Sequence, residues 1–143
     1  MDNIFQTSLI TAVAVIVCIG IHFTTLLFTT KVVGKFHGSH PGTIVFSLLL
    51  AVIAHLMEIL VFAFALQYMY SSNMIVFSID DPHFLDIFYF SGITYTTVGY
   101  GDIVLIDSGR TVAVIESVMG LVLIGWTTAF TYYEINRKWI RQT

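Results

Sequence analysis

Two glycines separated by one residue lie in the segment Thr97-Val98-Gly99-Tyr100-Gly101. An ordinary strand points successive carbonyl groups to opposite sides, whereas alternating right- and left-handed backbone conformations turn them to one side. Glycine enters the left-handed region at little steric cost, so the spacing of Gly99 and Gly101 suits that alternation. A row of carbonyl oxygens on one side can replace the water around a dehydrated cation. The segment therefore has the residue types that an oxygen cage for a cation requires.

The other residues of this segment have expected parts of their own. Thr97 adds a hydroxyl oxygen at the inner end of the row. Val98 and Tyr100 are expected to point away from the ions and to pack behind the row. One chain supplies only one strip of carbonyls, so a cage that surrounds an ion requires a ring of chains. We therefore expect the chain to assemble with copies of itself.

The composition indicates that the elements that position this segment lie in a membrane. Hydrophobic residues make up 57% of the chain and charged residues 10%, whereas a soluble domain has about 25% charged residues. Three segments, 4–30, 43–70 and 109–136, are long enough to cross a bilayer, which takes about 20 apolar residues. The sequence predicts an all-α membrane protein with one membrane domain, 1–143, and the lipid bilayer as its surroundings. Its few basic residues argue against binding nucleic acid.

Between the second and third apolar segments, the sequence predicts a short helix at residues 82–96. Asp80-Asp81-Pro82 is a typical helix start, because aspartate caps free N–H groups and proline is favoured in the first turn. This helix is too short to cross the membrane. At membrane depth such an element must be buried by protein or line a watery cavity. We expect it to re-enter from the outer side and the chain to return along the extended segment 97–102.

The basic residues predict the orientation, because cytoplasmic segments near a membrane are enriched in lysine and arginine. Three crossings place the first loop and the carboxyl-terminal tail on one side. Five of the six basic residues fall there: Lys31, Lys35, Arg137, Lys138 and Arg141. The predicted location is the cell membrane, crossed several times, with the N-terminus outside and the C-terminus in the cytoplasm.

The string Thr96-Thr97-Val98-Gly99-Tyr100-Gly101-Asp102 resembles the selectivity filter of potassium channels. Residues 89–97 resemble the pore helix of that family, and Ser108-Gly109-Arg110 resembles the start of its inner helix. The resemblance covers about residues 82–133. Helices one and two more weakly resemble those of small three-helix prokaryotic ion channels, through His55-Leu56-Met57-Glu58-Ile59 and Gly125-Trp126-Thr127-Thr128-Ala129. The plan of three helices suggests a prokaryotic inner membrane. The loop after Asp102 departs from the family, because it lacks a common proline and is about one residue short.

The resemblance implies a homotetrameric pore that conducts K⁺ passively. K⁺ would be the permeant ion, bound in the filter at Thr97, Val98, Gly99 and Tyr100, and no small-molecule substrate is expected. The single pore segment argues against related transporters, which carry several in one chain. Two alternatives remain: a cation channel of relaxed selectivity, and a non-conducting regulatory membrane subunit. We expect no enzyme activity, because the sequence has no nucleophile–base pair or phosphate-binding loop.

Other residues of the second half are predicted to support the filter or to line the pore. Thr96 adjoins the filter, and Tyr89 can brace it through a hydrogen bond to Asp102, although Asp102 can instead cap a turn. A stripe on the third helix either lines the cavity below the filter or packs against the second helix. Its members are Ser117, Leu121, Ile124, Thr128 and Tyr132. Gly120 either hinges this helix or permits close packing.

Ionisable residues inside the apolar segments are costly and often functional. Glu116 is expected behind the filter, protonated or hydrogen-bonded to the short helix, with a structural or a gating role. His55 and Glu58, three residues apart, can share a proton, but two ligands from one helix leave a metal shell incomplete. His22 is expected to hydrogen-bond between helices. No helix has arginine at every third position, so we expect a pore open by default or gated within the filter.

Overall fold

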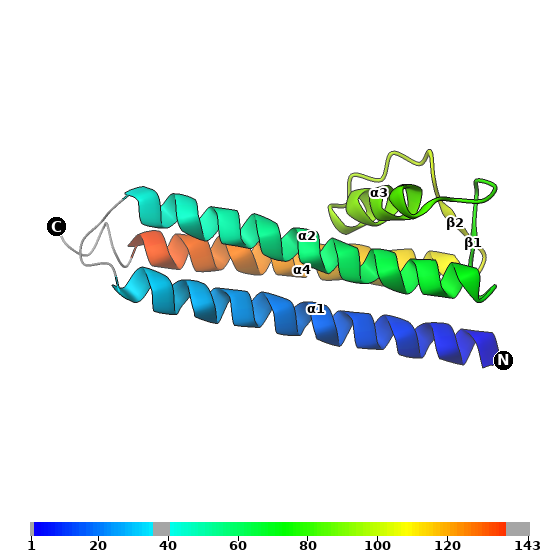
Figure 1. Cartoon of the computed structure of the whole chain (residues 1–143), viewed down its shortest axis with the longest axis horizontal. Helices are drawn as coiled ribbons and strands as arrows, with labels where there is room; N and C mark the ends of the chain where they lie inside the picture. The colour runs from blue at the N-terminus through cyan, green and yellow to red at the C-terminus, as the bar shows by residue number, and fades with distance from the viewer. Residues whose placement is uncertain (1, 36–40, 137–143) are drawn as a thin grey trace.

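The computed structural model describes residues 2–35 and 41–136. Three long helices lie side by side, and a short helix lies against one end of two of them (Figure 1). In chain order the elements are α1 (Asp2–Lys35), α2 (Pro41–Ser71), β1 (Val76–Phe77), α3 (Phe84–Tyr95), β2 (Leu105–Ile106) and α4 (Gly109–Ile135). Arg137, Lys138 and Arg141, on which the predicted orientation depends, lie outside the described residues, as do residues 36–40 between α1 and α2. Lys31 and Lys35, expected in the first loop, lie in the last turns of α1.

The three long helices confirm the three apolar segments expected from the sequence. Each is long and apolar enough to cross a membrane, with apolar spans of 32, 30 and 27 residues. At about 1.5 Å per residue, about 20 residues cover the hydrocarbon core, so each helix extends beyond it. Many apolar side chains face outward from the bundle, among them Ile4, Phe5, Val52 and Leu121. Outward apolar surface of this kind suits contact with lipid or with other apolar helices.

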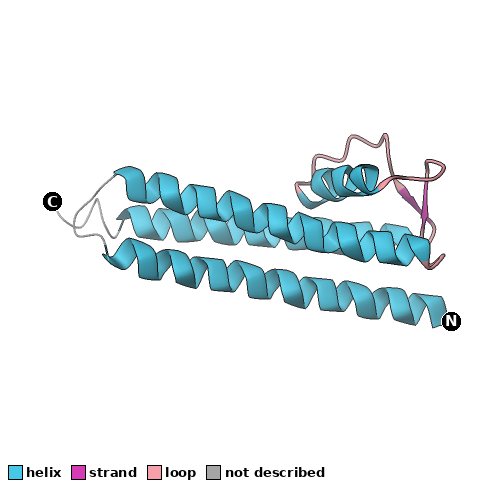
Figure 2. Ribbon diagram, in the orientation of Figure 1, coloured by secondary structure: helices cyan, strands magenta, loops and turns pink. Residues whose placement is uncertain are grey.

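The short helix α3 runs from one end of the bundle toward its middle, and the chain then turns back (Figures 1 and 2). Its start follows β1, and its last residue, Tyr95, contacts His55 near the middle of α2. The return segment ends at β2, beside β1. One face of α3 is buried against α2 and α4: Ile87, Phe90, Ser91, Ile93, Thr94 and Tyr95. Because α3 has 12 residues, it covers about 18 Å, roughly half of a bilayer core.

The start of α3 differs from the predicted start at Pro82. His83 is the N-cap residue, and its backbone N–H donates to Asp86 Oδ2 at 2.9 Å. Asp81 has a φ of +49°, which turns the chain before the helix begins. The capping carboxylate therefore comes from inside the first turn, where it also favours the positive end of the helix dipole. Asp80 and Asp81 precede the cap instead of forming it.

A two-residue antiparallel pair was not expected in an all-α fold. Val76 pairs with Ile106 and Phe77 with Leu105. The pairing extends by one step, because Ser78 N donates to the Val104 carbonyl oxygen at 2.8 Å. Segments this short give no periodic sequence pattern, which is why they could not be recognised. The pair joins the chain entering α3 to the chain leaving the return segment.

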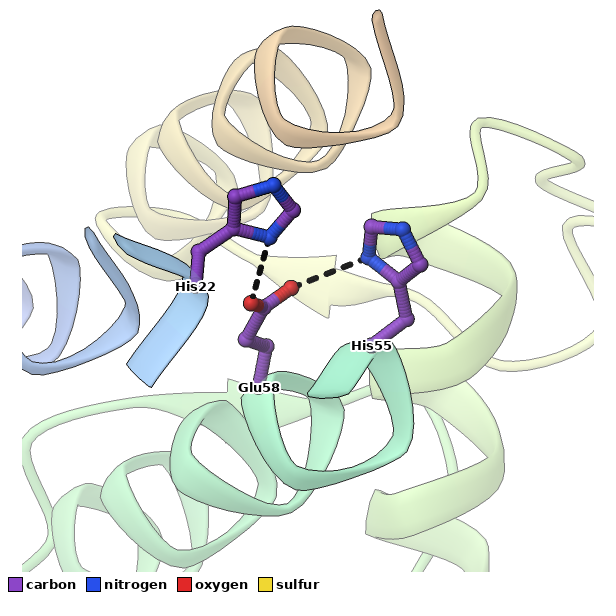
Figure 3. Close-up of side chains that lie close together, drawn as sticks. All are labelled: His22, His55 and Glu58. Carbon is purple, nitrogen blue, oxygen red and sulfur yellow. Dashed lines mark hydrogen bonds and ion pairs between the residues drawn. The ribbon is translucent and has the colours of Figure 1, made fainter. Parts of the chain in front are cut away.

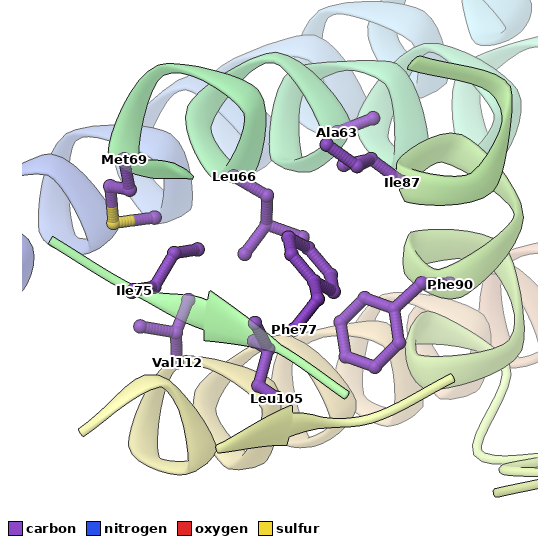
Figure 4. Close-up of a cluster of buried hydrophobic side chains, with 9 residues drawn as sticks. All are labelled: Ala63, Leu66, Met69, Ile75, Phe77, Ile87, Phe90, Leu105 and Val112. Carbon is purple, nitrogen blue, oxygen red and sulfur yellow. The ribbon is translucent and has the colours of Figure 1, made fainter. Parts of the chain in front are cut away.

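The main apolar core surrounds this pair and holds α3 against α2 and α4 (Figure 4). Its buried members are Ala63, Leu66, Met69, Ile75, Phe77, Ile87, Phe90, Leu105 and Val112. The rings of Phe77 and Phe90 meet edge to face with centroids 5.5 Å apart, an arrangement that aromatic pairs favour. Burial of side chains from α2, β1, α3, β2 and α4 in one cluster fixes the short helix in position.

Gly120 lies where α4 passes the carboxyl end of α3. A Cβ atom at this position would stand 2.0 Å from the Tyr95 carbonyl oxygen, so no larger residue fits unless a backbone moves. The structure therefore gives Gly120 the close-packing role, and its role as a hinge stays a prediction. Gly125, five residues further along α4, has no atom within 4 Å of such a Cβ.

Substitution of Gly120 by alanine should therefore destabilise the protein far more than the same substitution at Gly125. Forcing an extra methyl group into a packed site costs about 1–3 kcal/mol, and a clash with backbone lies at the upper end or beyond. Gly125→Ala should be neutral or raise stability by up to about 1 kcal/mol through helix propensity. Thermal unfolding of both purified variants, followed by helical circular dichroism, would measure the difference. Equal Tm values would contradict the close contact.

Candidate functional site

The backbone of the return segment alternates between conformations along its length. Thr97, Gly99 and Gly101 have φ values of +60°, +53° and +81°, while Val98 and Tyr100 between them are not in the left-handed region. The glycine spacing predicted this alternation at Gly99 and Gly101. Thr97 extends the alternation by one position. A positive φ is sterically strained for a β-branched residue, so other contacts must stabilise it.

Hydrogen bonds to the last turn of α3 supply that support. Thr97 N donates to the Thr94 carbonyl oxygen at 3.0 Å, and Gly99 N donates to the Ile93 carbonyl oxygen at 3.0 Å. Thr96 is the C-cap residue, and its hydroxyl donates to the Gly92 carbonyl oxygen at 2.7 Å. The free carbonyl groups of the helix end thus hold the start of the return segment, which sequence patterns alone do not reveal.

The far end of the segment is held by a contact between side chains. The Tyr89 hydroxyl, on α3, donates to Asp102 Oδ2 at 2.9 Å, which is the hydrogen bond that the sequence analysis considered. This hydrogen bond raises the pKa of the Tyr89 phenol, because only the protonated hydroxyl can donate it. Residues 97–101 are therefore suspended between two attachments to the same helix.

Within one chain the side chains of the segment do not pack as expected. Val98 is 52% exposed and Tyr100 73% exposed, so neither is buried behind the row of carbonyls by its own chain. Beside the segment lies a hollow of about 620 Å³, whose walls include Thr97, Gly99, Val114 and Ser117. An apolar hollow next to outward-pointing apolar side chains leaves this part of the surface incomplete in a single chain.

The stripe predicted on α4 is also largely uncovered. Leu121 is 62% exposed, Ile124 36% and Tyr132 70%. Ser117, at the top of the stripe, donates to the Thr94 carbonyl oxygen at 3.1 Å and so lies just beneath the end of α3. Because these side chains are exposed, the alternative that the stripe packs against α2 is wrong for this chain. Whether it lines a pore stays a prediction.

Glu116 lies on the opposite side of α4, fully buried against α3. The Ser91 hydroxyl is within hydrogen-bonding distance of Glu116 Oε1 and of the Ile59 carbonyl oxygen, 3.0 Å away. A serine has one hydrogen to donate, so two acceptors cannot both be satisfied. A protonated Glu116 resolves the conflict, because it donates to Ser91 and leaves the serine hydrogen for Ile59. Glu116 thus joins α4 to α3, and the hydrogen bond to the short helix is one of the two arrangements expected from the sequence.

If Glu116 is a neutral donor, Glu116→Gln should preserve the structure, because its amide has the same shape and also donates. The expected loss of stability is below about 1 kcal/mol. Glu116→Ala should cost about 2–5 kcal/mol, through the cavity and the contact it removes. Chemical or thermal unfolding in detergent would compare the two. Equal loss of stability in both variants would contradict the assignment of Glu116 as a neutral donor.

A second polar cluster lies near the middle of α1 and α2 (Figure 3). The imidazole Nδ1 of His22 is 2.9 Å from Glu58 Oε1, and Nδ1 of His55 is 3.0 Å from Glu58 Oε2. The Tyr95 hydroxyl donates to the same Glu58 oxygen. Thr127 Oγ1, on α4, is 3.1 Å from His55 Nε2. The pairing of His55 with Glu58 and the interhelical role of His22 were predicted, whereas Tyr95 and Thr127 were not recognised.

Sequence reasoning missed several of these residues for a common reason. Ser91, Tyr95 and Thr127 are polar but uncharged, and none of them forms a charged pair or a spaced ligand motif with its neighbours in the sequence. Such residues carry no spacing pattern, so their partners emerge only when helices meet. The one available indication was that Tyr95 lies in the last turn of the short helix predicted at 82–96, beside the glycine-rich segment.

The fold and site define a class of protein: a membrane protein with three spanning-length helices and a short helix that holds a glycine-rich return segment. The model of one protein family, described as an ion channel, matches residues 54–133, which is more than half of the chain. The chain therefore belongs to this ion-channel family. No curated protein and no solved structure gives a significant match.

Proposed function

We propose that the chain is the subunit of a potassium-selective channel in which four copies surround one pore. The observation that carries this proposal is the alternation of left-handed φ values at Thr97, Gly99 and Gly101 within a Thr-Val-Gly-Tyr-Gly segment. In that alternation successive carbonyl oxygens can face one side, where they replace the hydration shell of K⁺. Carbonyl oxygens of Thr97, Val98, Gly99 and Tyr100, with the Thr97 hydroxyl, are the proposed ligands.

Assembly into a ring is supported by the surfaces that one chain leaves uncovered. Thr97, Gly99 and Gly101 line the hollow beside the return segment. Val98 and Tyr100, which alternate with them along the chain, have exposed side chains. A neighbouring copy can cover both, and in doing so brings a second strip of carbonyls to the ion. The number four rests on the resemblance to potassium channels. The exposed stripe of α4 would then face the cavity below the filter.

The direction of α3 supports the same proposal. In a membrane, α3 would enter from one side and end about halfway across. The carboxyl end of a helix carries a partial negative charge, which favours a cation near Tyr95 and Thr96. The membrane orientation proposed here places the N-terminus outside, so that α3 and the filter open to the outer side. A prokaryotic inner membrane is the proposed location.

Flux of K⁺ into liposomes that contain only the purified chain would test the proposal, with Na⁺ as the competing ion. We expect K⁺ flux and little Na⁺ flux. Gly99→Ala should abolish K⁺ flux, because a Cβ atom strains a backbone held at a φ of +53° and disturbs the row of carbonyls. Gly20→Ala is the matched control, since its added Cβ meets nothing within 4 Å.

Each rival function predicts a different result. Equal flux of K⁺ and Na⁺ would indicate a cation channel of relaxed selectivity. No flux from correctly assembled protein, with Gly99→Ala equally silent, would favour a closed gate or a non-conducting regulatory subunit. Steep dependence on voltage or on an added ligand would contradict a pore that is open by default or gated at the filter.

A further inference from the structure

The cluster of His22, His55 and Glu58 brings three metal-ligand side chains together from two helices. The three ligand atoms lie within 4.8 Å of one another. The side chains of His22 and Glu58 are 1% and 0% exposed, and that of His55 is 18% exposed. From the sequence, His55 and Glu58 offered only two ligands on one helix. Packing of α1 against α2 adds the third.

The far sides of the two imidazoles also converge. His55 Nε2 is 3.1 Å and His22 Nε2 3.4 Å from the same atom, Thr127 Oγ1. If both histidines are neutral and donate from Nδ1 to Glu58, both Nε2 atoms need a donor. Thr127 has one hydrogen and can serve only one of them. In this tautomer one Nε2 atom therefore lacks a donor unless the cluster holds one further proton.

A metal ion at the Nδ1 atoms removes this shortage. Both Nε2 atoms then carry a hydrogen, and the two lone pairs of the Thr127 hydroxyl accept both. Histidines that bind metals commonly donate their second ring N–H to such an oxygen, which fixes the ring orientation. The structure thus contains three candidate ligands, His22, His55 and Glu58, and an acceptor, the Thr127 hydroxyl, that can orient both histidines.

We propose that His22, His55 and Glu58 bind one divalent transition-metal ion, with zinc as the best fit. Zinc bonds to nitrogen and oxygen of about 2.0–2.2 Å place tetrahedral ligands about 3.3 Å apart. The two Nδ1–carboxylate contacts, at 2.9 Å and 3.0 Å, would lengthen by a few tenths of an ångström, and the ligand atoms, now within 4.8 Å of one another, would draw together around the ion. The Tyr95 oxygen, 2.9 Å from His55 Nδ1, is placed to fill the fourth position.

The surroundings distinguish zinc from other ions. Two imidazoles and a carboxylate also suit ferrous iron, but such iron sites keep open positions for a reactant. Here Tyr95 takes the position that a water holds in zinc sites of two histidines and one glutamate, and the buried packing leaves no open position. Glu58 neutralises one charge of the ion, and the partial negative charge at the carboxyl end of α3 opposes the other. The bound metal would join α1, α2 and α3 directly and α4 through Thr127.

The first test is the metal content of the purified chain, isolated with a tag that contains no histidine and measured by inductively coupled plasma mass spectrometry. We expect about one zinc ion per chain, and near-complete loss in His22→Gln and Glu58→Gln. His83→Ala is the matched control, because His83 is exposed at the start of α3 and should leave the zinc content unchanged. X-ray absorption should show nitrogen and oxygen ligands at about 2.0–2.1 Å.

A second pair of variants keeps the test valid if a ligand variant fails to fold. Thr127→Val removes the acceptor but keeps all three ligands, so zinc affinity should fall about 10–100-fold. Thr127→Ser retains the hydroxyl and should bind zinc as the unaltered chain does. Competition with a chromophoric chelator would measure both affinities.

Folded, assembled protein that neither retains zinc nor takes up zinc, cobalt, nickel or ferrous iron would overturn the proposal. Equal zinc affinity in Thr127→Val and Thr127→Ser would do the same. The cluster would then be a ring of hydrogen bonds completed by one bound proton. These measurements need no ion flux, so their outcome is independent of whether the chain conducts K⁺.

Discussion

The fold depends on one close approach, where α4 passes the last turn of α3 with no side chain between the two backbones. Gly120 permits this contact with the Tyr95 carbonyl group. It sets the depth at which α3 ends, and so the level at which residues 97–101 begin. Ser117 and Glu116, on either side of the same turn of α4, add hydrogen bonds to Thr94 and Ser91. The position of the candidate cation ligands is thus set by helix packing behind them.

Two kinds of attachment keep the return segment in its unusual conformation. Backbone bonds from Thr97 and Gly99 use carbonyl groups that a helix end leaves free, and the Tyr89–Asp102 bond closes the far end. Neither kind of attachment requires a large apolar core beneath the segment. The segment can therefore stay exposed within one chain, as the side chains of Val98 and Tyr100 are.

The long helices and the backbone of the return segment could be predicted from the sequence, because each has a strong local pattern. Runs of apolar residues set α1, α2 and α4, and the spacing of Gly99 and Gly101 set the backbone alternation. The β1–β2 pair, the His83 cap and the Thr127 contact could not be predicted. They depend on two or three residues whose partners are distant in the chain. His22 is an example, because its partner Glu58 comes within reach only when α1 packs against α2.

The pairing of β1 with β2 has a consequence for how the protein is made. The residues between the two strands, which include α3, form a loop that the strand pair closes. This pair can form only when Leu105 and Ile106 have left the ribosome. The docking face for the end of α3 includes Gly120, which is synthesised later still. The apolar α1 and α2 can enter the membrane as they emerge. The end of α3 therefore cannot reach its final packing before α4 has been synthesised. The return segment that α3 holds is for the same reason among the last parts of the chain to reach its final position.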